Sequence, residues 1–318
     1  MSLPPWISPC QAELLQAFAD QRLGHAPLVQ GPAGVGKRLL AGWLVKRLLC
    51  LDSDGVEPCG SCRSCQLIEA GTHPDLFQVG LEEERSQILV DQIRRLAAGL
   101  VLTPGVGQYR VGLIDGAELM NQAAANALLK TLEEPSPGVW LVLVSDQPAL
   151  LPATIRSRCQ AVAVRPPAEE TARKWLAECC PEASPDDIEA ALAFTGGAPL
   201  MARDLIVSGE LALGEEVLEV LLGQRDADVS VLDTASRWAQ APTMAWRWLA
   251  HWTAAMMRAG SGTRQRAGNL ELPTELPPRQ LARLWDSALE GCRLSQGSIR
   301  QELLLGRWLL EWRQIQAR

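Results

Sequence analysis

The sequence predicts an α/β fold with a parallel sheet in its first half, followed by a helical second half. Strand-like apolar segments alternate with helix-like segments up to about residue 165. A glycine-rich loop joins the first of these strands to the next helix. Beyond residue 167 the strand pattern disappears and helical periodicity continues. Strands separated by helices are typical of crossover connections, and hence of a parallel sheet.

The first half supplies five short apolar segments with the character of strands. We expect them at residues 26–30, 75–79, 109–115, 139–145 and 159–164. Leucines recur at helical spacing over 39–48, directly after the glycine-rich loop. A further helix is expected at 90–100, and a helix-rich run is expected at 118–134, where Pro135 stops it.

The second half reads as helical after a proline-containing linker at 165–167. Helices are expected at 168–180 and 185–194, and helical spacing resumes at about residue 209. Most of the tryptophans lie beyond this point. We interpret them as core and helix-packing residues rather than as a ligand-binding set.

Composition and charge indicate which classes of protein the chain can belong to. Of 318 residues, 47% are hydrophobic and 21% are charged, and the formal net charge is −7. This length suits two or three domains. With no apolar run of membrane length and no signal-like start, we expect a cytoplasmic protein without membrane association. The acidic balance argues against tight DNA binding by the chain alone.

The segment Gly31-Pro-Ala-Gly-Val-Gly-Lys37 matches a phosphate-binding loop. It follows an expected strand and opens an expected helix, which is the context that such a loop requires. Gly31, Gly34 and Gly36 would let backbone N–H groups converge on phosphate, and Lys37 would reach the outer phosphates. We therefore interpret the segment as a phosphate loop by descent, not as a turn of purely structural origin.

Two features of an active nucleotide hydrolase are missing from the sequence. Arg38 follows the loop lysine, where a hydroxyl would bind Mg²⁺, and it adds a positive charge near the metal position. The third strand ends in Asp115, which suits a metal, but Gly116 stands where such hydrolases commonly have a glutamate that activates water. Glu118 is expected to begin the next helix. These changes predict a degenerate site that does not bind ATP and Mg²⁺ productively.

Four cysteines form a second candidate site. Cys59, Cys62 and Cys65 follow one another at two-residue spacings, and Cys50 precedes them. Cysteines in a cytosolic chain are expected to be reduced, and four thiolates suit tetrahedral zinc with Zn–S near ~2.3 Å. Iron–sulfur clusters use a similar spacing, usually followed by a later cysteine and proline that this sequence lacks. We expect a structural zinc module over residues 50–65.

Two arginines stand just before the fifth strand, in the segment Thr154-Ile-Arg-Ser-Arg-Cys159. Surface arginines are usually solvated. The alternative is an arginine finger, a residue given to a neighbouring subunit's nucleotide to stabilise charge in phosphoryl transfer. Arginine suits this role because its planar group stays charged and pairs with phosphate oxygens in a bidentate manner. Spacing alone leaves open whether Arg156 or Arg158 is the finger.

These features occur in one order with the segments NALLKTLEEP at 126–135 and LPATIRSRC at 151–159. In this combination the chain resembles the AAA+ clamp-loader subunits of bacterial DNA polymerase III. The resemblance covers essentially the whole chain and is most specific over residues 25–165. Among these subunits the chain is most similar to the delta prime type, which typically lacks ATPase activity.

The resemblance implies three domains. They are an AAA+ nucleotide-binding-like domain with the zinc module at 1–166, a small helical lid at 167–208, and a helical collar at 209–318 that packs subunits into a ring. It implies a part of the DNA polymerase III holoenzyme that helps to open the sliding clamp and to load it on primed DNA. The implied partners are the gamma or tau and delta subunits, with the clamp and primer-template DNA reached through the assembled complex.

In family terms, the Ser-Arg-Cys motif places the finger at Arg158, which would reach ATP on the adjacent gamma or tau subunit. Active members also carry a Gly-x-x-Arg segment in the lid, and Leu200 stands at its arginine position here. The favoured hypothesis is therefore a subunit without intrinsic ATPase activity. The alternative is an active gamma/tau-type ATPase, supported by the retained Lys37 and Asp115. A DNA-binding zinc protein is a third hypothesis, which the acidic charge disfavours.

Overall fold

A computed structural model describes residues 3–52, 55–83, 85–223, 230–260, 266–267, 270–273, 275–295, 297 and 299–316. The chain divides into two compact units, residues 1–171 and 172–318. The expected collar and nearly all of the expected lid fall in the second unit, so the boundary between them stays a prediction. Among the described residues, no helix combines the length and the apolar character needed to cross a membrane.

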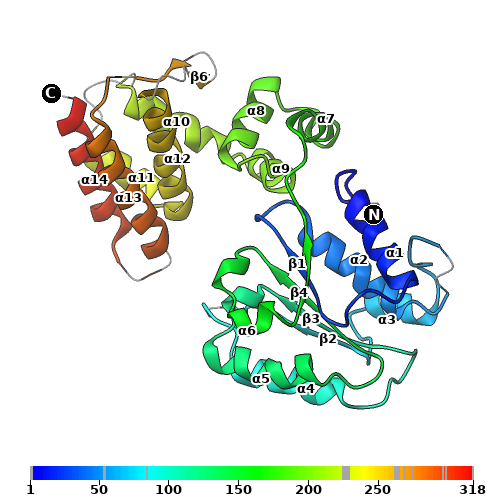
Figure 1. Cartoon of the computed structure of the whole chain (residues 1–318). Helices are drawn as coiled ribbons and strands as arrows, with labels where there is room; N and C mark the ends of the chain where they lie inside the picture. Colours follow the sequence, from blue (N-terminus) through cyan, green and yellow to red (C-terminus); the bar gives the residue numbers. More distant parts are fainter. Residues whose placement is uncertain are drawn as a thin grey trace. The chain divides into compact units, whose positions relative to one another are not determined.

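The first unit is a five-stranded parallel sheet with helices on both faces (Figure 1). Its elements are α1 (Ser8–Ala19), β1 (Pro27–Gln30), α2 (Lys37–Leu49), α3 (Arg63–Glu69), β2 (Leu76–Val79), α4 (Val90–Leu100), β3 (Arg110–Asp115), η1 (Ala117–Leu119), α5 (Gln122–Glu133), β4 (Val139–Ser145), η2 (Pro148–Leu150), α6 (Ala153–Arg156) and β5 (Gln160–Ala163). The strand order is β2-β3-β4-β1-β5. Helices α4 and α5 pack together on one face, and α2 lies against the other.

The predicted α/β fold with a parallel sheet is confirmed. All five predicted strands are present, each ending within one residue of its expected bounds, and the predicted helix at 90–100 is α4. The predicted helix-rich run over 118–134 is divided into two elements, the short 3-10 helix η1 and the α-helix α5. Gly116 has a positive φ of 74° and leads into the short turn η1, and α5 begins only after Asn121, whose side chain accepts a hydrogen bond from the backbone N–H of Ala124.

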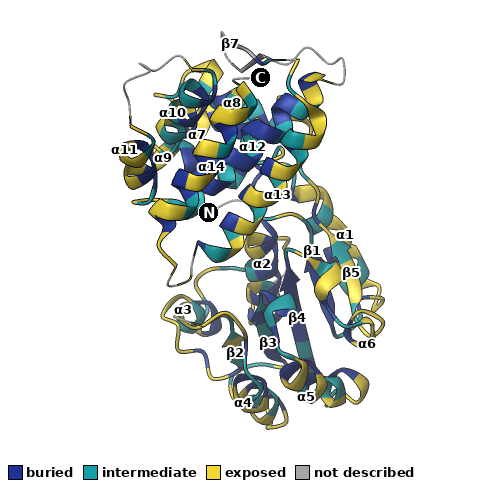
Figure 2. Ribbon diagram, turned by 90° about the vertical axis from the view of Figure 1, so that its left-hand side faces the viewer, coloured by how far each residue is buried: buried dark blue, intermediate teal, exposed yellow. Residues whose placement is uncertain are grey.

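The register of the sheet brings three chain segments to one edge. Gln30 at the end of β1 pairs with Ser145 at the end of β4, and Asp115 at the end of β3 lies beside Val144. Strands β3 and β4 are largely buried (Figure 2). Because all strands are parallel, the loops that follow β1, β3 and β4 meet at this carboxyl edge, which is where α/β sheets bind ligands.

Apart from a two-stranded antiparallel sheet, the described residues of the second unit form helices and their connections. Its elements are α7 (Glu169–Cys179), which crosses the boundary, α8 (Pro185–Phe194), α9 (Pro199–Val207), α10 (Leu211–Leu221), α11 (Val231–Trp238), α12 (Pro242–Gly260), β6 (Arg266–Ala267), β7 (Leu270–Glu271), α13 (Pro278–Leu294) and α14 (Gln301–Gln316). The longest of these, α12, packs closely against α13.

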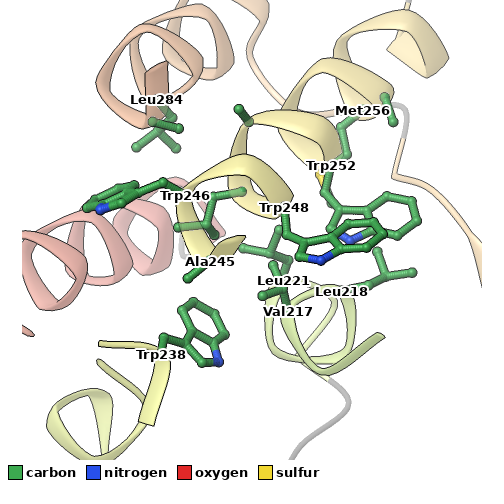
Figure 3. Close-up of a cluster of buried hydrophobic side chains, with 14 of the residues drawn as sticks. Val217, Leu218, Leu221, Trp238, Ala245, Trp246, Trp248, Trp252, Met256 and Leu284 are labelled. Atoms are coloured by element: carbon green, nitrogen blue, oxygen red, sulfur yellow. The ribbon is translucent and has the colours of Figure 1, made fainter. Parts of the chain in front are cut away.

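Tryptophans fill the core of this second unit (Figure 3). Trp246 and Trp248 of α12 are almost fully buried. Each indole lies against a glycine, because a Cβ at Gly291 would meet Trp246 at 2.3 Å and a Cβ at Gly214 would meet Trp248 at 2.4 Å. The interpretation of the tryptophans as core residues is confirmed.

Candidate functional site

The glycine-rich loop leaves β1 at the carboxyl edge of the sheet and enters α2. Gly31, Gly34 and Gly36 all have positive φ angles, of 153°, 76° and 96°. Gly36 is the N-cap residue of α2. A Cβ at Gly31 would lie 2.0 Å from the carbonyl oxygen of Val164. The loop therefore has the positive φ angles that favour glycine, and its first glycine is required by the packing of the sheet.

The loop lysine is already paired within the protein. The Lys37 side chain is only 2% exposed, and its Nζ lies 2.5 Å from Oδ1 of Asp146. Nζ also donates a hydrogen bond to the carbonyl oxygen of Pro32. Asp146 directly follows β4, so it comes from the neighbouring strand of the same edge. A carboxylate thus contacts the ammonium group that a phosphate would otherwise neutralise.

Arg38 pairs with the aspartate that was predicted to help hold a metal. Its Nε lies 2.9 Å from Oδ1 and 2.7 Å from Oδ2 of Asp115. This hydrogen bond is the main cause that raises the pKa of Arg38, although partial burial acts against it. Nη2 of Arg38 also lies 3.9 Å from Oδ2 of Asp146. Both carboxylates at this edge therefore face cationic side chains of α2.

The two residues Gly116 and Glu118, which follow Asp115, have structural roles. Gly116 has a φ of 74°, which a side chain would strain, and a Cβ there would lie 3.0 Å from Leu119. Glu118, in η1, uses its Oε1 to accept hydrogen bonds from the backbone N–H groups of Asp146 at 2.8 Å and Gln147 at 3.3 Å. This carboxylate positions the end of β4. The helix that was expected to begin at Glu118 begins one residue earlier, at Ala117, as the short 3-10 helix η1.

Arg158 lies at the opposite edge of the sheet from the loop. It precedes β5, whose first residue pairs with Pro27 at the start of β1. Its Nη2 lies 2.6 Å from Oε1 of Glu133, and its Nη1 donates to the carbonyl oxygen of Thr154 at 3.0 Å. The side chain is 36% exposed. Arg156, at the end of α6, is also exposed.

The four predicted metal ligands come together. The sulfur atoms of Cys50, Cys59, Cys62 and Cys65 all lie within 4.8 Å of one another, and those of Cys50 and Cys62 are 4.0 Å apart. A tetrahedral site with Zn–S bonds of ~2.3 Å requires sulfur separations of roughly 3.8 Å. The four cysteines therefore fit a closed zinc site without rearrangement of the backbone.

Backbone N–H groups point at these sulfur atoms. The N–H of Cys59 donates to Sγ of Cys50 at 3.3 Å, and the N–H of Cys62 donates to Sγ of Cys59 at 3.3 Å. Hydrogen bonds from the N–H groups of Cys62 and Ser61 lower the pKa of Cys59 to about 6. Such bonds stabilise thiolates, which are the form that binds metal.

A buried polar chain, which sequence reasoning did not predict, connects the cysteine module to the sheet. Oγ of Ser64 in α3 lies 2.9 Å from Nε2 of His73, whose Nδ1 accepts from the N–H of Asp75 at 3.1 Å. Asp75 in turn pairs with Arg110 of β3 at 3.3 Å. Since Nδ1 is an acceptor, the proton is on Nε2, and Ser64 accepts it. The arrangement anchors α3 and does not activate a nucleophile.

Comparisons with known proteins agree on one family. Residues 8–168 match the model of the family described as DNA polymerase III, delta subunit. The chain is 40% identical over 255 residues to the DNA polymerase III subunit delta' of Pseudomonas aeruginosa, covering 80% of this chain and 77% of that protein. It is 36% identical to the Escherichia coli subunit of the same name, covering 68% of this chain and 65% of that one.

Two further similarities are to proteins of the tau/gamma type. The chain is 33% identical to the tau/gamma subunit of DNA polymerase III from Haemophilus influenzae, over 69% of this chain and 32% of that protein. The crystal structure of a DNA polymerase III gamma subunit-related protein from Thermotoga maritima superposes with a TM-score of 0.53 at 19% identity, covering 96% of this chain and 99% of that chain. This structural likeness concerns the fold.

Proposed function

Since the chain belongs to the delta prime family of DNA polymerase III subunits, we propose that it is a clamp-loader subunit that does not hydrolyse ATP and that gives Arg158 to a nucleotide on a neighbouring subunit. Its neighbours would be gamma or tau and delta. The assembled complex, and not this chain alone, would engage the sliding clamp and primer-template DNA. The four cysteines would hold a structural zinc ion.

The contact that carries the non-hydrolysing role is the pair between Arg38 and Asp115. Mg²⁺ in a phosphate-loop site is held by a hydroxyl after the lysine and by the carboxylate of the neighbouring strand. Here the hydroxyl is replaced by a guanidinium, which contacts both oxygens of that carboxylate. Mg²⁺ would have to break this pair and would then face an unpaired positive charge nearby.

The position of Arg158 supports action on another chain's nucleotide. β1 has four residues, so roughly 13 Å of strand separates the edge that carries Arg158 from the edge that carries the glycine loop. Arg158 is thus remote from its own loop and accessible from outside the sheet. Its pairing with Glu133 is between half-exposed groups and weak, so a phosphate could replace it at little cost.

The isolated chain should show no ATP turnover above background in the presence of Mg²⁺. The reason is that the metal ligand set is incomplete and no carboxylate stands at position 116 to activate water. Turnover is measured by phosphate release, with Lys37→Ala as the control that separates resident activity from contamination. Clear turnover that Lys37→Ala abolishes would contradict the proposal and would favour a gamma/tau-type ATPase, for which the 33% identity to a tau/gamma subunit is the supporting observation.

Arg158→Ala should leave assembly of the loader intact and slow hydrolysis at the adjacent ATP site by about 10³-fold or more, the scale seen for arginine fingers in GTPases. Steady-state ATPase of the reconstituted loader would fall by at least that site's share. Arg95→Ala removes another exposed arginine of the first unit and is the matched control. Unchanged turnover with Arg158→Ala would remove this residue from the mechanism, and a loss with Arg156→Ala alone would move the finger to Arg156.

A further inference from the structure

We propose that Asp146 is the residue that excludes phosphate from the retained glycine loop, by acting as an internal anion for Lys37. The inference deepens the proposed function, on which it rests, by naming what closes the resident site to triphosphates. It also predicts that the loop binds such anions once this one carboxylate is neutralised.

The first step of the argument is that the cradle itself is intact. Three glycines with positive φ lead into the first turn of α2, and Gly36 caps that helix through its backbone alone. Free N–H groups at a helix N-terminus attract anions. Neither Arg38 nor Gly116 blocks this cradle, because both act on the metal and on water. Loss of hydrolysis therefore does not by itself account for loss of anion binding.

The second step is that Lys37 is engaged by a fixed partner. Its Nζ lies 2.5 Å from Oδ1 of Asp146, and the side chain is 2% exposed whereas that of Asp146 is 27% exposed. A buried ammonium group requires an anion nearby. Asp146 supplies that charge from within the chain, in the place where an outer phosphate oxygen would supply it.

The third step is that the main chain of Asp146 is held where it is. The backbone N–H of Asp146 donates to Oε1 of Glu118 at 2.8 Å, and Ser145 before it is the last residue of β4. Nη2 of Arg38 lies 3.9 Å from Oδ2 of the same carboxylate. An entering phosphate would therefore meet a negative charge on a residue whose backbone the sheet holds in place, beside the lysine with which it pairs.

Asp146→Asn is the variant that tests this inference. The probe is inorganic tripolyphosphate, measured by calorimetry in a magnesium-free buffer without chelator, so that zinc is retained. We expect Asp146→Asn to bind tripolyphosphate about 10- to 100-fold more tightly than the unaltered chain, which is the scale of one charge-assisted contact. Asp20→Asn removes the same charge from an exposed pair with Arg22 elsewhere in the unit, and should change nothing.

A second variant shows whether the gain in tripolyphosphate affinity depends on Lys37. Lys37→Met combined with Asp146→Asn removes both charges and should lose the gain. Should Asp146→Asn fold poorly because Lys37 is left buried without a partner, thermal melting with and without tripolyphosphate gives the same information, since a ligand stabilises only a state that binds it.

Three outcomes would overturn the inference. In the first, Asp146→Asn binds tripolyphosphate no more tightly than Asp20→Asn does. In the second, the double variant gains as much tripolyphosphate affinity as Asp146→Asn does. In the third, the unaltered chain already binds tripolyphosphate tightly. Failure of the proposed function looks different, because it is ATP turnover by the unaltered chain in the presence of Mg²⁺. A chain that turned ATP over, yet bound tripolyphosphate better as Asp146→Asn, would refute the proposed function and support the role of Asp146.

Discussion

Cys65→Ser is expected to abolish zinc binding and to unfold the segment 50–65, while the five-stranded sheet stays folded. The helix at the end of the segment is too short to be stable alone. It is α3 (Arg63–Glu69), which begins inside the segment, has seven residues, fewer than an isolated helix needs, and has Ser64 and Cys65 as its buried residues. Apparent binding free energies of structural zinc are about 10–16 kcal/mol in zinc-finger peptides, so the local loss should be on the order of several kcal/mol.

Elemental analysis should find about one zinc per unaltered chain and almost none in Cys65→Ser. Limited proteolysis should then cut within 50–65 first. Cys10→Ser is the matched control, because Cys10 lies in the same unit and its thiol donates to the carbonyl oxygen of Ala163, a bond that a hydroxyl can also make. Removal of zinc from the unaltered chain by a chelator should reproduce the effect. A metal-replete, well-folded chain that contains no zinc would refute the four-thiolate site.

Gly31→Ala is expected to destabilise the first unit by about 3–5 kcal/mol, a large share of the ~5–15 kcal/mol that holds a typical domain folded. The added Cβ would lie 2.0 Å from the carbonyl oxygen of Val164, which is backbone and cannot rotate away. Relief would require β5 to move from β1 and would break the bond from the N–H of Val164 to the carbonyl oxygen of Gln30, which is 2.8 Å long.

Chemical denaturation followed by circular dichroism measures this effect. Gly42→Ala is the control, because Gly42 lies within α2 and a Cβ there meets no atom within 4 Å. That substitution should be neutral or stabilising by roughly 1 kcal/mol, since alanine is the better helix former. Equal stability of the two variants would mean that Gly31 is kept for phosphate and not for packing.

This contrast bears on which glycines the fold itself requires. Gly31 allows β1 and β5 to approach, and Gly116 allows the turn after β3. The fold requires such residues whether or not a nucleotide is present. Arg38 and Asp146 instead form ion pairs at the carboxyl edge of the sheet, with Asp115 and Lys37 respectively.

Much of the fold was predictable because its signals are local. Runs of apolar residues marked the five strands, and cysteine spacing marked the four cysteines that the fold brings together. The break within the helical run at 118–134 also has a local cause: helical composition continues through a turn that Gly116 and Asn121 impose. A short helix such as α3 has too few residues for its helical periodicity to be recognised in the sequence.

The pairings within the site were not predictable, because they join residues that only the sheet brings together. The partner of Lys37 is a residue after β4, and the partner of Arg158 is Glu133 at the end of α5. The sequence suggested a degenerate nucleotide site from Arg38, Gly116 and Leu200, without showing that the guanidinium of Arg38 takes the carboxylate of Asp115. Such contacts depend on register and crossover geometry, which no periodicity encodes.

Because the tryptophans are unevenly distributed between the two units, their fluorescence reports mainly on the unfolding of one of them. Three of its 11 tryptophans, Trp6, Trp43 and Trp140, lie in the first unit, and the rest lie in the second. Those of α12 and α14 are buried, and some are stacked on one another, as with Trp308 and Trp312, whose ring centroids are 6.0 Å apart. Intrinsic fluorescence will therefore follow mainly the melting of the helical half. Damage confined to the sheet or the cysteine segment will leave most of the emission unshifted.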